Sequence, residues 1–167
     1  TITANVEEAA RFVRRSRGVP MAHYRCRVHT PMSVEDAFAF MSDVRHFEHW
    51  DPGVVSVTQV VGDGPGPDAV YDVLTSSGGR EALFRYGVTA YDSPVGYTIV
   101  GKKTPFTSTD VISVEPADPG ALVTYAADLD MPFPLSLADR WLQGVFDPIG
   151  DAAAAGLAAA LEGEWLR

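Results

Sequence analysis

Asp110 is the residue of this chain whose type and setting most clearly permit chemistry. Phe106, Ser108, Asp110, Ile112 and Val114 occur at every second position, so in a strand they share one face. If that face points inward, the carboxyl group is desolvated, its pKa rises and it can act as a general acid or base. The alternative, which we slightly favour from the sequence, is an irregular strand start that leaves Asp110 at the solvated rim.

Two histidines form a second candidate site. His46 and His49 are three residues apart, with Glu48 and Asp51 nearby, and this spacing can present two metal ligands on one side of a helix. Because no third ligand follows at a defined spacing, we expect no metal site. The favoured interpretation is a pair of surface histidines flanking Trp50, and the alternative gives His46 an acid/base role at the mouth of a cavity.

The sequence contains none of the common signatures of nucleophilic or cofactor-dependent enzymes. Gly-x-Ser-x-Gly, the P-loop, Cys-x-x-Cys and the dinucleotide fingerprint do not occur, and the glycine-rich run at 62–66 has a proline where phosphate-binding N–H groups would be needed. Cys26 is the single cysteine and is expected to be buried and unreactive. We therefore expect no cofactor.

Composition indicates a folded acidic domain. A chain of 167 residues with 46% hydrophobic and 21% charged residues can bury a sizeable core, and a net charge of −9 argues against binding to nucleic acid. No apolar run approaches the roughly 18 to 20 residues of a membrane span. Charged residues precede any apolar segment at the N-terminus, so no signal peptide is visible and we expect a cytoplasmic protein.

Alternating hydrophobicity and turn residues predict an antiparallel sheet of seven strands. Two short helices follow the first strand, one with Ser33 as N-cap and continuing to Met41, the other from Val44 to Trp50. Gly, Pro, Asp and Ser separate the remaining strand-like runs. The predicted strands cover residues 23–30, 54–61, 69–76, 81–91, 96–102, 107–115 and 121–129.

One long helix from Pro134 to Arg167, bent at Pro148, is expected to cover the sheet. The fold class is therefore α+β, with a curved antiparallel sheet wrapped around this C-terminal helix. Such a wrap can leave an apolar cavity between sheet and helix.

Strand alternation also predicts which side chains point toward the helix. Several of them are tyrosines, whose buried hydroxyl groups need partners that a polar-lined cavity or a ligand would provide; plain core packing is the alternative. The inward set is Tyr24, Cys26, Val55, Val57, Tyr71, Val73, Phe84, Tyr86, Val88, Tyr97, Ile99, Asp110, Ile112, Val114, Tyr125, Ala127 and Leu129. The expected ligand-binding residues are Trp50, Tyr71, Phe84, Tyr86, Tyr97, Asp110, Tyr125, Trp141, Val145 and Phe146.

The order of elements and several short motifs resemble the START-like, helix-grip superfamily, also labelled SRPBCC, and within it the polyketide cyclase/dehydrase and lipid-transport group. Residues 33–40 with Asp43 and Trp50-Asp51-Pro52 are similar to the opening motif of that group, and the run 120–125 is similar to its "GTxVTY" strand. Phe38 stands where the family has Trp and Ala121 where it has Thr. The resemblance covers about residues 21–161 and implies a helix-grip fold.

We expect residues 21–167 to form a START-like domain that binds a small hydrophobic molecule, such as a polyketide, isoprenoid or lipid, without cofactor. Residues 1–20 are expected to form an N-terminal helical arm. The resemblance also implies an alternative, a cyclase, aromatase or dehydratase in which Asp110, His46 or a tyrosine of the cavity moves protons. A third alternative is an interaction module in which the arm joins two copies into a homodimer.

Overall fold

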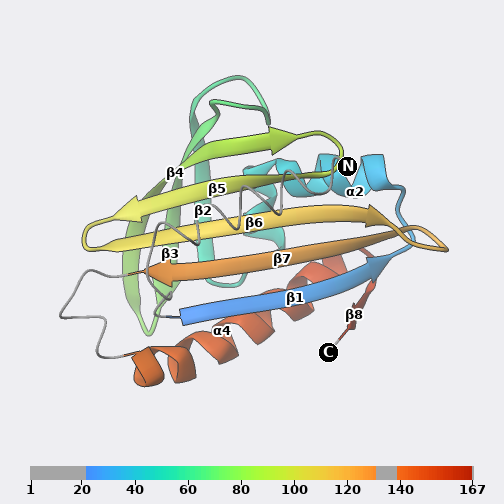
Figure 1. The fold of residues 1–167 in the computed structure, drawn as a ribbon. Coiled ribbons are helices and arrows are strands. Elements are labelled where there is room, and N and C mark those ends of the chain that lie inside the picture. The colour runs from blue at the N-terminus through green and yellow to red at the C-terminus, as the bar shows by residue number, and fades with distance from the viewer. Residues whose placement is uncertain (1–21, 131–138, 167) are drawn as a thin grey trace.

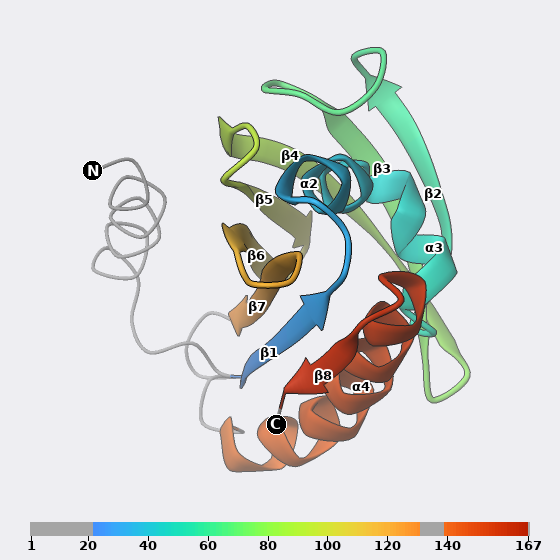
Figure 2. The ribbon, with the colours of Figure 1, turned by 90° about the vertical axis from the view of Figure 1, so that its right-hand side faces the viewer.

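The computed structural model describes residues 22–130 and 139–166, in which an eight-stranded antiparallel sheet curves around helices on one side (Figures 1 and 2). The strand order is β2-β3-β4-β5-β6-β7-β1-β8. Consecutive strands β2 to β7 are neighbours, as in a meander, and β1 joins the far side of β7. The elements are β1 (Ala22–Thr30), α2 (Val34–Ser42), the 3-10 helix η1 (Val44–His46), α3 (Phe47–Trp50), β2 (Val54–Val61), β3 (Val70–Ser77), β4 (Arg80–Asp92), β5 (Gly96–Lys103), β6 (Phe106–Pro116), β7 (Ala121–Asp130), α4 (Asp139–Ala160) and β8 (Glu164–Leu166).

The short helices begin where the sequence predicts. Ser33 caps α2 by accepting a hydrogen bond from the N–H of Asp36 at 3.0 Å, and Asp43 caps η1 by accepting from the N–H of Arg45 at 3.1 Å. Figure 2 shows α2, α3 and α4 all on the concave side of the sheet. These helices bury the apolar face of the sheet, which forms one continuous hydrophobic core with them.

Helix α4 is held to the start of β1 by a side chain. The side-chain amide of Gln143 donates to the carbonyl oxygen of His23 at 2.8 Å and accepts from the backbone N–H of His23 at 2.9 Å. These are the two hydrogen bonds that a neighbouring strand would make with this residue at the free edge of β1. Farther along, Gly150 lies against the ring of Tyr24, where any Cβ would overlap it. The helix continues through Pro148.

The predicted helix from Pro134 to Arg167 is wrong at its C-terminal end. Helix α4 ends at Ala160, where the N–H of Gly163 donates to the carbonyl of Ala158 at 2.8 Å and closes the last turn. The chain then forms β8, the eighth strand, which pairs with β1. The sheet therefore has eight strands instead of the expected seven. The sequence did not predict β8 because the strand forms by pairing with unpaired backbone groups of β1, and a helix-forming composition does not reveal that pairing. Residues 134–138 lie outside the described part.

Two β-bulges change the inward set. In β2, Val54 pairs with Thr75 and Ser56 with Leu74, so Val55 is an extra residue, and its side chain is 48% exposed instead of inward. In β4, Val88 pairs with Ile99 and Ala90 with Thr98, so the alternation shifts at Thr89. Tyr91, which is absent from the predicted inward set, therefore packs against the core.

Candidate functional site

The strand register places the candidate residues in neighbouring rows on the concave face. One row runs Tyr86–Gly101–Ser108 across β4, β5 and β6, and the next contains Ile99 and Asp110. A Cβ at Gly101 would lie closer than 3.0 Å to the ring of Tyr86. The missing side chain therefore lets Tyr86 lie flat across β5 toward Ser108.

Asp110 lies inside the protein and not at the rim. It is 3% exposed, its Oδ1 accepts a hydrogen bond from the Ser108 hydroxyl at 2.7 Å, and its Oδ2 accepts from the Tyr125 hydroxyl at 3.2 Å. The slight preference for a solvated rim is thus wrong, because β6 pairs without interruption with both neighbours from Thr107 onward and its alternation holds at Asp110. The carboxyl group and two hydroxyl groups form a compact polar cluster within an apolar interior.

Burial raises the pKa of Asp110 to about 7, although the hydrogen bonds from Ser108 and Tyr125 act in the opposite direction. The negative charges of Asp51 and Asp128 raise it further. Burial also raises the pKa of Tyr125 well above its ordinary value, so this hydroxyl group remains a hydrogen-bond donor at neutral pH. The arrangement can therefore hold or release one proton near neutral pH beside a fixed donor.

Asp51 is a second carboxyl group near this cluster that the sequence analysis did not select. Burial raises its pKa, and the hydrogen bond from the N–H of Gly53, 2.8 Å long, opposes the shift. Its charge raises the pKa of Asp110 and of Tyr125. The available signal was its place in the Trp50-Asp51-Pro52 motif, which carried the family resemblance.

Four buried side-chain donors have no partner in the described part of the chain. Thr98 and Thr109 alternate with inward residues of β5 and β6 and so lie on the convex face, and the other two donors lie in the concave interior. They are the indole Nε1 of Trp50, a residue 2% exposed, and the hydroxyl of Tyr71, which is 0% exposed. Trp50 packs against Tyr125 with ring centroids 5.5 Å apart. A buried polar group without a partner destabilises the fold by about 1–3 kcal/mol. Such groups are retained where water or a ligand supplies the acceptor.

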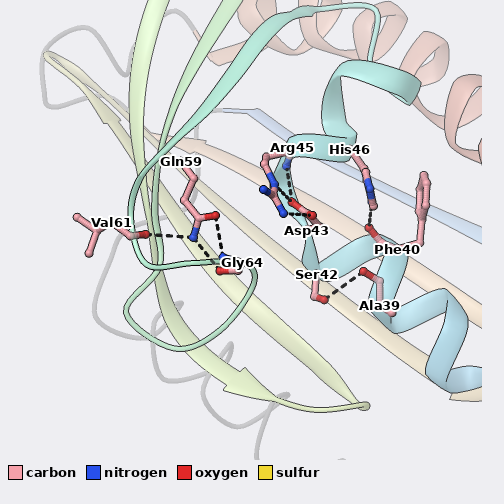
Figure 3. Close-up of polar contacts among 9 residues, drawn as sticks. All are labelled: Ala39, Phe40, Ser42, Asp43, Arg45, His46, Gln59, Val61 and Gly64. Carbon is pink, nitrogen blue, oxygen red and sulfur yellow. Dashed lines mark hydrogen bonds and ion pairs between the residues drawn. The ribbon is translucent and has the colours of Figure 1, made fainter.

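The charges of Asp43, which follows α2, and of Arg45 in η1 act on Tyr71. Figure 3 shows these two charged side chains. Arg45 donates from Nε and Nη2 to the two carboxylate oxygens of Asp43 at 2.8 and 2.7 Å. This bidentate pair lowers the pKa of Asp43 and raises that of Arg45. Tyr97, also fully buried, donates its hydroxyl to the carbonyl of Met41 on α2.

His46 contacts helix α2. Its Nδ1 lies 2.8 Å from the carbonyl oxygen of Phe40, and its ring stacks on that of Phe40 at 4.7 Å (Figure 3). The rings of His46 and His49 are 5.7 Å apart. Within residues 22–130 and 139–166, no group of three or more His, Cys, Asp or Glu side chains could hold a metal ion.

Of the remaining predicted site residues, Phe84 and Phe146 have described side chains. Phe84 is half-buried next to Tyr86, with ring centroids 6.1 Å apart, and Phe146 of α4 is half-buried against the core. The side chains of Trp141 and Val145 lie outside the described residues. Tyr91, which the sequence analysis missed because of the bulge, contacts Phe38 at 5.5 Å.

The sequence matches the family model described as polyketide cyclase / dehydrase and lipid transport over residues 21–162. No curated protein sequence matches the chain. None of the helices described is long and apolar enough to cross a membrane.

Several solved structures share the fold at low sequence identity. A START superfamily protein from Mycobacterium smegmatis has a TM-score of 0.69 and 15% identity, covering 84% of this chain and 97% of its own. The protein TTHA0849 from Thermus thermophilus has a TM-score of 0.69 and 13% identity, with the same coverage. The Zhui aromatase/cyclase from Streptomyces sp. R1128 has a TM-score of 0.68 and 11% identity, covering 84% of this chain and 93% of its own. At these identities the likeness concerns the fold.

Proposed function

Since the chain belongs to the polyketide cyclase / dehydrase and lipid transport family, we propose that it binds a small hydrophobic molecule between the sheet and α4. The ligand would be a polyketide, an isoprenoid or a lipid. The observation that carries the proposal is the pair of fully buried donors, Trp50 Nε1 and the Tyr71 hydroxyl, without acceptors in the described chain. A ligand lying between sheet and helix would supply those acceptors and bury its own apolar surface.

The surroundings of these donors favour an apolar molecule. Val73, Ile99, Ile112 and Ala127 on the concave face are buried and belong to the continuous hydrophobic core. Burial of apolar ligand surface against such side chains supplies most of the binding free energy of a small molecule, and a few polar groups orient it.

Binding of the neutral fluorescent probe N-phenyl-1-naphthylamine tests the proposal. The protein is expected to bind one probe molecule saturably. In the variant Ala127→Leu, the larger side chain would occupy space beside Asp110, and the affinity should fall by about tenfold or more, which corresponds to about 1.4 kcal/mol. Because the added side chain would enter ligand space, the free energy of unfolding should change little.

Leu83→Ser is the matched control, because Leu83 is 53% exposed on the sheet and its loss should leave probe binding unchanged. A filled interior gives the opposite pattern. The natural protein would then bind no probe saturably, and Ala127→Leu would lower the free energy of unfolding by about 1–3 kcal/mol through overpacking. That result would reject the proposal.

Acid/base catalysis on the bound molecule, of the cyclase or dehydratase type, is the second candidate function. One observation favours it: the buried carboxyl of Asp110 has a pKa of about 7 and accepts a hydrogen bond from Tyr125. A structurally similar protein is an aromatase/cyclase. The candidate requires a carboxyl group that titrates near neutral pH, so a measured pKa of Asp110 near its ordinary value of 3.8 would exclude it.

A further inference from the structure

The chemistry of the two unpartnered donors restricts what the ligand can be. An indole N–H can only donate, so Trp50 requires an acceptor. Burial and the charge of Asp43 raise the pKa of the Tyr71 hydroxyl, which therefore keeps its proton at neutral pH and can also donate. Trp50 packs on Tyr125 of β7, whereas Tyr71 belongs to β3, and three strands lie between β3 and β7 in the sheet, so one acceptor atom is needed for each donor.

The charges near these donors disfavour an anionic ligand. Two acidic groups raise the pKa of Asp110, which lies next to Tyr125 and hence near Trp50. They are Asp51 and Asp128, and the carboxylate of Asp128 is already paired with the ring of His23. At the Tyr71 end, the guanidinium of Arg45 is already paired with both oxygens of Asp43 (Figure 3). The charge of Asp63 also acts on Arg45. An anion entering this interior would meet like charges, and the paired guanidinium would do little to offset the loss of its hydration.

We infer that the molecule bound in this interior is uncharged and carries two separate acceptor oxygens, one bonded by Trp50 Nε1 and the other by the Tyr71 hydroxyl. This inference rests on the proposed function and narrows it. Ketone, ester and ether oxygens meet the requirement. A free fatty acid does not, because its carboxylate is charged, and a pure hydrocarbon does not, because it has no hydrogen-bond acceptor. Satisfying both donors removes the penalty of two buried unpaired groups, so oxygenated ligands should be selected over apolar analogues of the same shape.

Three naphthalenes of closely similar shape separate these properties. The probe 2,6-diacetylnaphthalene is neutral with a carbonyl oxygen at each end, 2,6-diethylnaphthalene has no acceptor, and naphthalene-2,6-dicarboxylate has acceptors but two negative charges. Each competes with N-phenyl-1-naphthylamine for the natural protein. The diacetyl compound should bind at least about tenfold more tightly than the diethyl compound, as expected for hydrogen bonds to buried donors, and the dicarboxylate should bind most weakly.

Variants assign the selectivity to the two donors. Tyr71→Phe removes only the hydroxyl, and Trp50→Phe removes the N–H together with part of the ring. The ratio of diacetyl to diethyl affinity is the readout, because a change in packing alters both affinities while a lost hydrogen bond alters only the first. The ratio should fall about threefold to tenfold in each variant. It should be unchanged in Tyr24→Phe, whose hydroxyl bonds to Asp151 at 2.8 Å outside the interior.

The possible results separate this inference from the proposed function. Equal binding of the diacetyl and diethyl compounds, preferred binding of the dicarboxylate, or a ratio that neither donor substitution changes would overturn the inference and leave hydrophobic binding intact. If no naphthalene and no fluorescent probe binds to the natural protein, the proposed function itself fails, and the inference with it.

Discussion

At the level of single residues, Asp110 is a carboxyl group held almost entirely out of contact with water. A carboxyl that is 3% exposed and bonded by two hydroxyl groups must either be neutral or carry a charge in a medium that poorly solvates it. Desolvation outweighs the two hydrogen bonds, so the pKa rises to about 7 from an ordinary value of 3.8. The folded protein therefore holds this proton over a pH range in which the unfolded chain has released it.

This difference makes stability depend on pH. Above pH 3.8 the unfolded chain loses the proton while the fold keeps it up to about pH 7, so the free energy of unfolding should decrease as pH rises through this window. The full effect is roughly 4 kcal/mol at about 1.4 kcal/mol per pH unit. Asp110→Asn lacks the titrating group, so urea denaturation at a series of pH values should show a difference between natural protein and variant that changes across the window.

Asp72→Asn provides a control of opposite sign. The ion pair with Arg85 lowers the pKa of Asp72, so its contribution to stability is present above its unfolded pKa and is lost only as pH falls. Parallel stability curves for the natural protein and Asp110→Asn between about pH 4 and 7 would mean that the carboxyl of Asp110 is not perturbed. The acid/base candidate would then lose its support.

At the level of elements, the contact between α3 and α4 positions Trp50. A Cβ at Gly156 of α4 would lie closer than 3.0 Å to the carbonyl oxygen of Trp50, a backbone atom that cannot move aside. Gly156→Ala should therefore lower the free energy of unfolding by about 1–3 kcal/mol, as overpacking does. Gly144 of the same helix has open space around its Cα, so Gly144→Ala should raise stability by about 1 kcal/mol through helix propensity.

Urea unfolding followed by circular dichroism measures both variants. If the two alanines shift stability in the same direction, the close approach of α4 to α3 is absent in solution. A further consequence is that Gly156→Ala should weaken binding of 2,6-diacetylnaphthalene, because it displaces the carbonyl of Trp50 and with it the indole donor.

Sequence prediction succeeded for most of the strands, and it failed at two bulges and at the last strand. Alternation located all the strands from β1 to β7 because each has one apolar face. It failed at Val55 and Tyr91 because bulges insert an extra residue without any change in composition. It missed β8, since the partner of Trp165 is Val28, far away in the sequence, and only the folded edge of β1 makes that pairing available.

At the level of the whole molecule, the helix-grip fold follows from the antiparallel meander. One face of the meander is apolar and is buried by packing against a long amphipathic helix. The sequence analysis listed Asp110, Tyr125 and Trp50 among the expected ligand-binding residues, although it slightly favoured a solvated position for Asp110. It could not identify which donors lack partners, because hydrogen bonding depends on distances that periodicity does not contain. The N-terminal arm and a homodimer formed through it remain predictions, since residues 1–21 are outside the described part.

Native mass spectrometry of the protein purified from its own cells tests the central claim most directly. The account predicts a species heavier than the 18.0 kDa chain that releases one neutral, oxygen-containing apolar molecule on denaturation. The released compound should rebind to the natural protein and bind more weakly to Tyr71→Phe. A protein found only at the chain mass, which also fails to bind 2,6-diacetylnaphthalene, would contradict the claim that the space between sheet and helix holds a ligand.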